Sequence, residues 1–335
     1  MKILILGGGG MIGQRLLEHL VTKPQIGGKS ISQVTVLDAF IEPRIPRSSD
    51  FAIDSQIADI TNSQTCVESI ATKPDVIFHL AAIVSGEAES NFERGYSVNL
   101  DGTRNLFEVI RAQDDYCPRV VYTSTAAVYG GPYPLNPEFA GDDFILQPTT
   151  SYGIQKAIGE LLLNDYSRRG FLDGVGLRLP TICVRPGKPN AAASGVFSNI
   201  IREPLVGIET TLAVSKDVSM VFASPRSAVG FLTHAAQLDT KQLGTRRSMM
   251  MPGVHATIRD EIEALRRVAG DKVVSYIREV PVDTFAQQMV DAWNFPAFPA
   301  SRARNLGFTC EKTFDELIHL HIESELDGKI PGQNV

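Results

Sequence analysis

The sequence predicts an α/β fold, a doubly wound parallel sheet followed by a small α/β lobe. Short apolar runs, each long enough for one buried strand, alternate with segments whose apolar residues recur at helical spacing. A glycine-rich turn joins the first apolar run to the first helical segment. We expect the sheet domain to cover residues 1–178 and the second lobe mainly residues 179–330, with some segments returning to the sheet.

The elements of the sheet domain are expected in alternating order along the chain. The apolar runs predict strands over residues 3–6, 34–37, 76–80, 120–124 and 175–179. The helical spacing predicts helices over residues 12–21, 98–112 and 152–166. Strands that alternate with helices of this length pair in parallel, and their crossovers are right-handed.

The alternation stops after residue 179. Residues 185–195, rich in Pro, Gly and Ala, predict a loop. We expect helices over residues 196–202, 226–236, 257–268 and 314–326, and a strand over residues 273–277. Thr257, followed by Asp260, is a helix start signal. We expect the tail, residues 328–335, to be loosely held.

Composition excludes several classes of function. The 335-residue chain has a formal net charge of -6 and no basic run, which argues against nucleic acid as a partner. The four cysteines are far apart, so we expect a reducing compartment, no disulfide framework and no metal site. No apolar stretch approaches the roughly 20 residues that span a bilayer. We therefore expect a cytoplasmic protein with no membrane partner.

The glycine turn predicts a dinucleotide site on a Rossmann sheet. Gly7, Gly10 and Gly13, with Met11 and Ile12 between the last two, follow the first strand and open the first helix. Glycine permits the tight turn and lets the backbone approach a pyrophosphate, which the free N–H groups of the helix start can bind. The alternative reading of four consecutive glycines is a flexible turn.

The second strand ends at Asp38, where a carboxylate can accept hydrogen bonds from a ribose 2′-hydroxyl and repel a 2′-phosphate. This favours NAD over NADP as the cofactor. The neighbouring Arg44 and Arg47 keep NADP open, and a simple turn aspartate is the other alternative.

Tyr152 and Lys156 form a Tyr-x-x-x-Lys pair, which lies on one face of a helix. A nearby ammonium favours phenolate, so Lys156 would lower the pKa of Tyr152 and let it exchange a proton with a substrate hydroxyl. The hydroxyls of Thr123, Ser124 and Thr125 fall at the carboxyl end of a strand, where open α/β sheets bind ligands. A polar strand end without catalytic function is the alternative.

Together these segments resemble the extended short-chain dehydrogenases/reductases over nearly the full length of the chain. The resemblance is also carried by Asp59-Ile60, by the segments at residues 79–82 and 99–106, by Leu177-Arg178 and by residues 303–308. It implies an NAD-dependent enzyme acting on CH–OH groups, with the second lobe binding the substrate. It also implies a homodimer through the helices at residues 98–112 and 152–166.

The resemblance assigns roles to particular residues. Asp59 and Ile60 would contact adenine, Thr125, supported by Ser124, would be the catalytic hydroxyl, and Tyr152 the general acid/base. Lys156 would bind the nicotinamide ribose and depress the pKa of Tyr152. The remaining expected cofactor contacts are Leu80, Ala81, Ala82, Asn99, Thr123, Leu179 and Thr181. Asn99 is more often structural in this family.

Departures from the family pattern bear on the substrate. The segments at residues 179–187 and 226–231 differ from those of members that act on nucleotide sugars. Residues 178–187 and 197–203 instead resemble members that oxidise a four-carbon sugar acid at its 2-hydroxyl. Such an acid needs a cation for its carboxylate, and guanidinium suits it through its bidentate fork. The expected substrate contacts are Ser85, Ser124, Thr125 and Tyr152, with Arg185, Lys188 and Arg226 as candidate cations.

Two other functions remain open from the sequence. A nucleotide-sugar epimerase with tightly bound NAD would use the same Tyr152 and Lys156 without net formation of NADH. A non-catalytic regulatory protein that senses NAD would keep the fold but would not need the acid/base pair.

Overall fold

The computed structural model describes residues 1–46, 49–130, 141–142, 144–187, 194–291 and 297–333. Its centre is a seven-stranded sheet in which all paired strands are parallel. The spatial order is β12 (Ser248–Met250), β8 (Asp173–Leu179), β7 (Arg119–Thr125), β6 (Val76–His79), β1 (Lys2–Leu6), β4 (Gln33–Asp38) and β5 (Ala52–Ile57). The strand order reverses between β1 and β6. In a doubly wound sheet, ligands bind in the crevice at the carboxyl ends of the two strands where the order reverses. The predicted α/β fold is confirmed.

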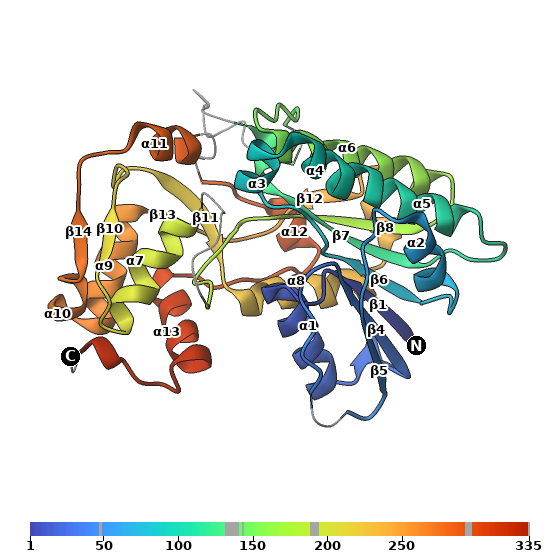
Figure 1. Cartoon of the computed structure of the whole chain (residues 1–335), viewed down its shortest axis with the longest axis horizontal. Coiled ribbons are helices and arrows are strands. Elements are labelled where there is room, and N and C mark those ends of the chain that lie inside the picture. The colour runs from blue at the N-terminus through green and yellow to red at the C-terminus, as the bar shows by residue number, and fades with distance from the viewer. Residues whose placement is uncertain (47–48, 131–140, 143, 188–193, 292–296, 334–335) are drawn as a thin grey trace.

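Helices cover both faces of this sheet (Figure 1). Alternate strand residues point to opposite faces, so Ile3 and Ile5 pack on one side and Leu4 and Leu6 on the other. The first side is covered by α1 (Met11–Thr22) and α8 (Pro225–Gln237). The second side is covered by α2 (Ser63–Ile70), α5 (Thr103–Arg111) and α6 (Ser151–Arg168).

The second lobe has its own apolar core and lies beside the sheet domain, on the left in Figure 1. Its main helices are α7 (Gly195–Leu205), α9 (Ile258–Ala269) and α13 (Phe314–Glu325). Its strands form the sheet β13-β11-β9 (Val254–Thr257, Ser219–Ala223 and Thr181–Ile182) and the pair β10-β14 (Thr210–Leu212 and Ile277–Glu279). The predicted capping box is present, because Thr257 and Asp260 bond each other's backbone N–H at the start of α9.

Short elements complete the described chain. They are the hairpin β2-β3 (Gln25–Ile26 and Lys29–Ser30), α3 (Ser85–Ser90), α4 (Phe92–Tyr96), the π-helical turn η1 (Ser97–Gly102), η2 (Ala126–Tyr129), η4 (Thr240–Leu243), α10 (Asp271–Val274), α11 (Thr284–Asp291), α12 (Ser301–Asn305) and η5 (Pro331–Gln333). The single helix predicted over residues 98–112 is therefore two pieces, η1 and α5.

Two expectations for the second lobe are wrong. Residues 273–277 were expected to be a strand, but β14 begins only at Ile277: Gly270, at φ 85°, ends α9, and a new helical turn buries Val273 in the core. The tail was expected to be loose, but η5 is held through Gln333: its side chain donates to the Ala269 carbonyl, and Gly332 packs on the backbone after α7.

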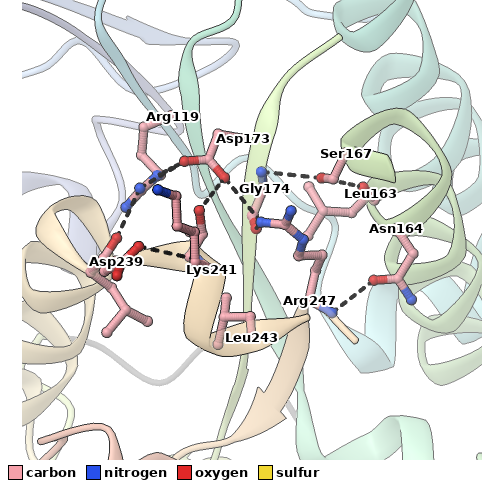
Figure 2. Close-up of polar contacts among 12 residues, drawn as sticks. Arg119, Leu163, Asn164, Ser167, Asp173, Gly174, Asp239, Lys241, Leu243 and Arg247 are labelled. Carbon is pink, nitrogen blue, oxygen red and sulfur yellow. Dashed lines mark hydrogen bonds and ion pairs between the residues drawn. The ribbon is translucent and has the colours of Figure 1, made fainter. Parts of the chain in front are cut away.

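A cluster of charges ties the amino-terminal ends of β7 and β8 to the covering helices (Figure 2). Asp173 accepts hydrogen bonds from Arg119, Arg247 and the Thr240 hydroxyl. Arg119 also donates to the carbonyls of Ala235 and Leu238 at the end of α8. The segment after α8, which leads to β12, is thereby fixed against the sheet.

No helix within the described ranges is long and apolar enough to cross a membrane. Across the same ranges, no group of three or more His, Cys, Asp or Glu side chains is arranged to hold a metal ion.

Candidate active site

A cavity of about 530 Å³ lies where the carboxyl ends of the central strands face the second lobe. The sheet domain contributes the glycine turn, the ends of β6, β7 and β8, and the first turns of α6. The second lobe contributes the start of α7 and part of β11. This is the crevice at the switch point between β1 and β6.

The glycine turn forms the floor of the cavity, which Gly7, Gly10, Met11, Ile12 and Gly13 line. Gly7 has φ 83°, and a Cβ added to it would lie 2.6 Å from the Ala81 nitrogen. A Cβ on Gly13 would lie 2.4 Å from the Gly7 carbonyl oxygen. The N–H groups in the first turn of α1 have no partners within the helix. No side chain caps this helix start, and its first turn contains no acidic residue. The turn therefore has the shape and the donors that a pyrophosphate needs.

Asp38 fixes the loop beside this turn. Its carboxylate accepts N–H bonds from Gly9 at 3.0 Å and from Phe40 and Ile41, each also at 3.0 Å. Arg44 is exposed, and its backbone N–H donates to Gln14. Arg47, which kept NADP open, lies outside the described residues. The nearest fixed charge beside the turn is thus negative, which suits a ribose with a free 2′-hydroxyl.

The segment that follows β6 forms another wall of the cavity. Leu80 and Ala82 line the cavity, and Ala81 packs against Gly7. Asp59 and Ile60 lie outside the lining residues. Ile60 is buried against Gly102. Burial alone would raise the pKa of Asp59, but hydrogen bonds from Thr61 and the charge of Arg94 hold it below its usual value.

Asn99 does not face the cavity. It is fully buried in η1, where its side chain bonds both the N–H and the carbonyl of Ile83 and donates to Gln155 on α6. All three contacts are with protein, so the expected cofactor contact is wrong and Asn99 is a clamp between η1, the loop after β6 and α6.

Tyr152 and Thr125 meet at the centre of the cavity. Thr150 caps α6 and so places Tyr152 in its first turn, while Thr125 ends β7. The Thr125 hydroxyl acts on the Tyr152 hydroxyl to lower its pKa, and the Thr125 oxygen accepts the Ala127 N–H at 3.2 Å. Burial raises the pKa of Tyr152 to about 12, and both Arg185 and the Thr125 hydrogen bond act against this rise.

Lys156 does not supply the charge that the sequence led us to expect beside Tyr152. Its ammonium donates to the Thr123 carbonyl at 2.9 Å and lies 4.8 Å from the centre of the Tyr122 ring. The cation that lowers the pKa of Tyr152 is Arg185. Burial lowers the pKa of Lys156 to about 7, and the carboxylate of Glu160 opposes that change.

Ser124 lines the cavity, but the residue is only 3% exposed and its hydroxyl donates a hydrogen bond to the Glu160 carboxylate at 2.5 Å. The proton of Ser124 is therefore committed to a protein carboxylate. Thr125 is the hydroxyl of this strand end that contacts Tyr152. Thr123, which donates to the His79 carbonyl, lines the cavity as well, as do Leu179, Thr181 and Ser85.

The three candidate cations have different outcomes. Arg185 lines the cavity, with its Nε donating to the Ile182 carbonyl at 3.0 Å and one Nη to the Ser194 hydroxyl at 2.9 Å. The prediction that Arg226 contacts the substrate is wrong, because its side chain lies on the exposed side of α8 and pairs with Glu323 at 2.9 Å. Lys188 lies outside the described residues.

One wall was missed from the sequence. Ser194, Ser198, Asn199 and Arg202 line the cavity from the start of α7. Arg202 is neutralised by Glu203 at 2.6 Å and donates to the Arg185 carbonyl at 2.8 Å, so it braces the loop that carries Arg185. The spacing of Ser194, Ser198 and Arg202 at every fourth residue is the signal that places them on one helix face.

Comparison with known proteins finds a matching family and relatives that are similar over nearly the whole chain. The model of the NAD dependent epimerase/dehydratase family matches residues 3–237. A D-erythronate dehydrogenase of Cupriavidus necator is 43% identical over 96% of this chain and 98% of its own, and one of Haemophilus influenzae is 35% identical over 97% and 100%. The crystal structure of a nucleoside-diphosphate-sugar epimerase from Agrobacterium tumefaciens is 52% identical, with a TM-score of 0.93, over 98% of this chain and 96% of that one.

Proposed function

Because this chain belongs to the NAD-dependent epimerase/dehydratase family and is an NAD-dependent oxidoreductase, we propose that it oxidises the 2-hydroxyl of D-erythronate to give 2-dehydro-D-erythronate. The two dehydrogenase relatives span nearly the whole chain, including the lobe that faces the cofactor site. They support a small sugar acid as the substrate class.

The position of Arg185 carries the proposal. Its guanidinium shares one cavity with Tyr152 and Thr125, and within the described part of the chain no acidic side chain pairs with it. Burial lowers the pKa of Arg185, which is the cost of keeping a cation without a counter-ion. A carboxylate beside the reacting carbon would supply that counter-ion through charge-assisted hydrogen bonds.

The residues of the floor fit NAD. The N–H groups at the start of α1 would hold the pyrophosphate, Asp38 the adenosine ribose, and Lys156 the nicotinamide ribose; Asp59 and Ile60 would lie near the adenine. When bound, the nicotinamide ring supplies the hydride acceptor.

The remaining residues handle the substrate. Arg185 holds its carboxylate, and Thr125 orients the 2-hydroxyl toward Tyr152. Tyr152 takes the hydroxyl proton as the carbon loses a hydride, so the product is a 2-oxo acid and one proton is released. Ser85 and the α7 wall would close the space around the short carbon chain.

A nucleotide-sugar epimerase is the second candidate, because the Agrobacterium relative is described as a nucleoside-diphosphate-sugar epimerase. The guanidinium of Arg185, which has no acidic partner among the described residues, favours a carboxylate over a sugar hydroxyl at this place. A regulatory protein that only senses NAD is disfavoured, since it does not need the Tyr152–Thr125 pair.

We also propose a homodimer that forms through α5 and α6. Ile154 and Leu161 on α6 are 37% and 64% exposed, and both are apolar residues that such an interface would cover. Gel filtration at a mass of two chains is expected, and a mass of one chain would contradict this part of the proposal.

The experiment is to follow NADH formation with NAD and a set of candidate substrates. D-erythronate should give steady NADH, while erythritol, which has the same carbon chain without the carboxylate, should give much less. Silence with every acid, together with conversion of a UDP-sugar without net NADH, would replace the dehydrogenase by an epimerase.

A further inference from the structure

Helix α6 carries a third polar side chain in line with the pair already described. Tyr152, Lys156 and Glu160 follow one another at intervals of four residues, so they form one row along the helix. Glu160 is 2% exposed and is not among the residues that line the cavity. A carboxylate this deeply buried is strongly destabilising unless its oxygens are bonded.

The oxygens of Glu160 are fully used by two strands. One oxygen accepts the Ser124 hydroxyl at 2.5 Å from β7 and the Nε of Arg178 at 3.0 Å from β8. The other accepts an Nη of Arg178 at 2.8 Å. Because Ser124 immediately precedes Thr125, these bonds hold the strand end that carries the substrate-orienting hydroxyl against the helix that carries Tyr152.

The guanidinium of Arg178 also interacts with two groups other than Glu160. Its second Nη donates to the Tyr129 hydroxyl at 2.7 Å and lies 4.0 Å from the Asp142 carboxylate. The guanidinium also lies 4.9 Å from the centre of the Tyr129 ring. The cluster thus contains the cations Lys156 and Arg178 and the anions Glu160 and Asp142, and removal of the Glu160 charge leaves an excess positive charge in a buried region.

Lys156 is the group most sensitive to that charge. Facing it are His79 from β6, Tyr122 from β7 and Glu160 from its own helix, with Arg178 from β8 behind Glu160. His79 is neutral, since burial and the charge of Lys156 lower its pKa to about 3. Glu160 is the anion that opposes the loss of a proton from Lys156, whose pKa lies at about 7.

We propose that Glu160 is a positioning residue of the hydride-transfer site, which locks the Ser124–Thr125 strand end to α6 and supplies the negative charge that keeps Lys156 an ammonium. This inference rests on the proposed roles of Tyr152 and Lys156. The ammonium form matters because a cation beside the nicotinamide ribose donates charge-assisted hydrogen bonds to its hydroxyls.

The test compares three variants by the pH dependence of NADH binding, which is followed through NADH emission and needs no substrate. Glu160→Gln keeps the size and most hydrogen bonds but removes the charge. Glu160→Asp keeps the charge, and Ser124→Ala removes only the bond to the strand end.

The pH at which NADH affinity falls should move down by about 1 to 3 pH units in Glu160→Gln. It should stay close to the wild-type position in Glu160→Asp and in Ser124→Ala. Coincident profiles for Glu160→Gln and wild type would overturn the inference. If Glu160→Gln does not fold, the double variant Glu160→Gln/Arg178→Gln, which removes both buried charges, takes its place with the same two outcomes.

The outcome is separate from that of the proposed function. A wild-type protein that oxidises no sugar acid still gives NADH-binding profiles, so the role of Glu160 is decided either way. A wild-type protein that oxidises D-erythronate while the profiles coincide would leave the dehydrogenase proposal standing and remove only the role of Glu160.

Discussion

At the scale of single residues, the proposed oxidation depends on a proton path that begins at Tyr152. Thr125 and the Arg185 guanidinium from the opposite wall both lower the pKa of the Tyr152 hydroxyl. Lys156 instead lies between the Thr123 carbonyl and the Tyr122 ring. The base and the carboxylate anchor therefore come from different domains and meet only in the folded chain.

Replacing Tyr152 by phenylalanine removes the proton acceptor and leaves the ring in place. Turnover should fall by at least about 100-fold, the usual contribution of general acid–base catalysis. NADH binding should remain, because the cofactor contacts lie on the glycine turn and Lys156. Tyr116→Phe is a matched control: its hydroxyl bonds the Pro74 carbonyl outside the cavity, so its activity should match wild type.

Replacing Arg185 by methionine removes the proposed partner of the substrate carboxylate. Loss of a charged hydrogen bond costs about 1.5–3 kcal/mol, so KM for the acid should rise about 10- to 150-fold. Arg226→Met should leave KM unchanged, because that side chain pairs with Glu323 on the surface. Equal effects of the two substitutions would contradict the assignment of Arg185.

The same variant has a predicted effect on pH dependence. Burial raises the pKa of Tyr152, so activity that needs its deprotonated form should increase as the pH rises. Arg185 lowers that pKa, and its removal should therefore move the rise of kcat/KM to higher pH. A rise at unchanged or lower pH would show that the guanidinium does not act on the base.

At the scale of elements, sequence patterns predicted the strands and helices whose form depends on neighbouring residues in the chain. The central strands are buried on both faces and read as apolar runs, whereas β5 is an exposed edge strand with no such run and was missed. Residues 271–274 are helical because Gly270, with a positive φ, ends α9 and redirects the backbone into a new helical turn. The apolar residues of this segment are equally compatible with a strand, so their pattern did not predict the turn.

The site follows the same division. Tyr152 and Lys156 are four residues apart, and the hydroxyls at the end of β7 are consecutive, so local spacing identified both groups. The link between Glu160, Ser124 and Arg178 joins three separate elements and has no local signal. Asn99 and Arg226 were misplaced for the same reason, since only the fold shows whether a polar side chain faces protein, solvent or the cavity.

The turn between β1 and α1 gives the sharpest test at this scale. A Cβ in Gly13→Ala would lie 2.4 Å from the Gly7 carbonyl oxygen and 2.6 Å from the Gly8 Cα, so the turn must shift. We expect lower thermal stability and loss of NADH binding. Gly230→Ala in α8 is the control: its Cβ meets nothing within 4 Å, and the helix should gain about 0.5–1 kcal/mol.

At the scale of the whole molecule, the cleft requires that the sheet and the segments after residue 179 hold one arrangement. The cluster around Asp173 does this at the amino-terminal ends of β7 and β8 (Figure 2). Burial alone would raise the pKa of Asp173, but the hydrogen bond from Thr240 and the charges of Arg119 and Arg247 hold it below its usual value.

Asp173→Asn should lower the free energy of unfolding by about 1–3 kcal/mol at neutral pH, because it removes the charge that two guanidinium groups share. A carboxyl with a lowered folded-state pKa stabilises the fold above its unfolded pKa, and this stabilisation is lost as the pH falls through the folded value. The difference between wild type and variant should therefore shrink below about pH 4.

Denaturant unfolding at several pH values measures this difference. Asp217→Asn is the comparison, since its pair with Arg259 is exposed on both sides and should matter little. A difference for Asp173→Asn that persists unchanged at low pH would mean that charge is not the source of its contribution.

The central claim is that a hydride leaves C2 of a sugar acid and is released as NADH. The most direct measurement uses D-erythronate deuterated at C2 and determines the mass of the NADH formed. NADH that carries the deuterium is expected, together with the 2-oxo acid. Unlabelled NADH would place the oxidation at another carbon, and turnover that returns the label to a sugar without free NADH would make the protein an epimerase.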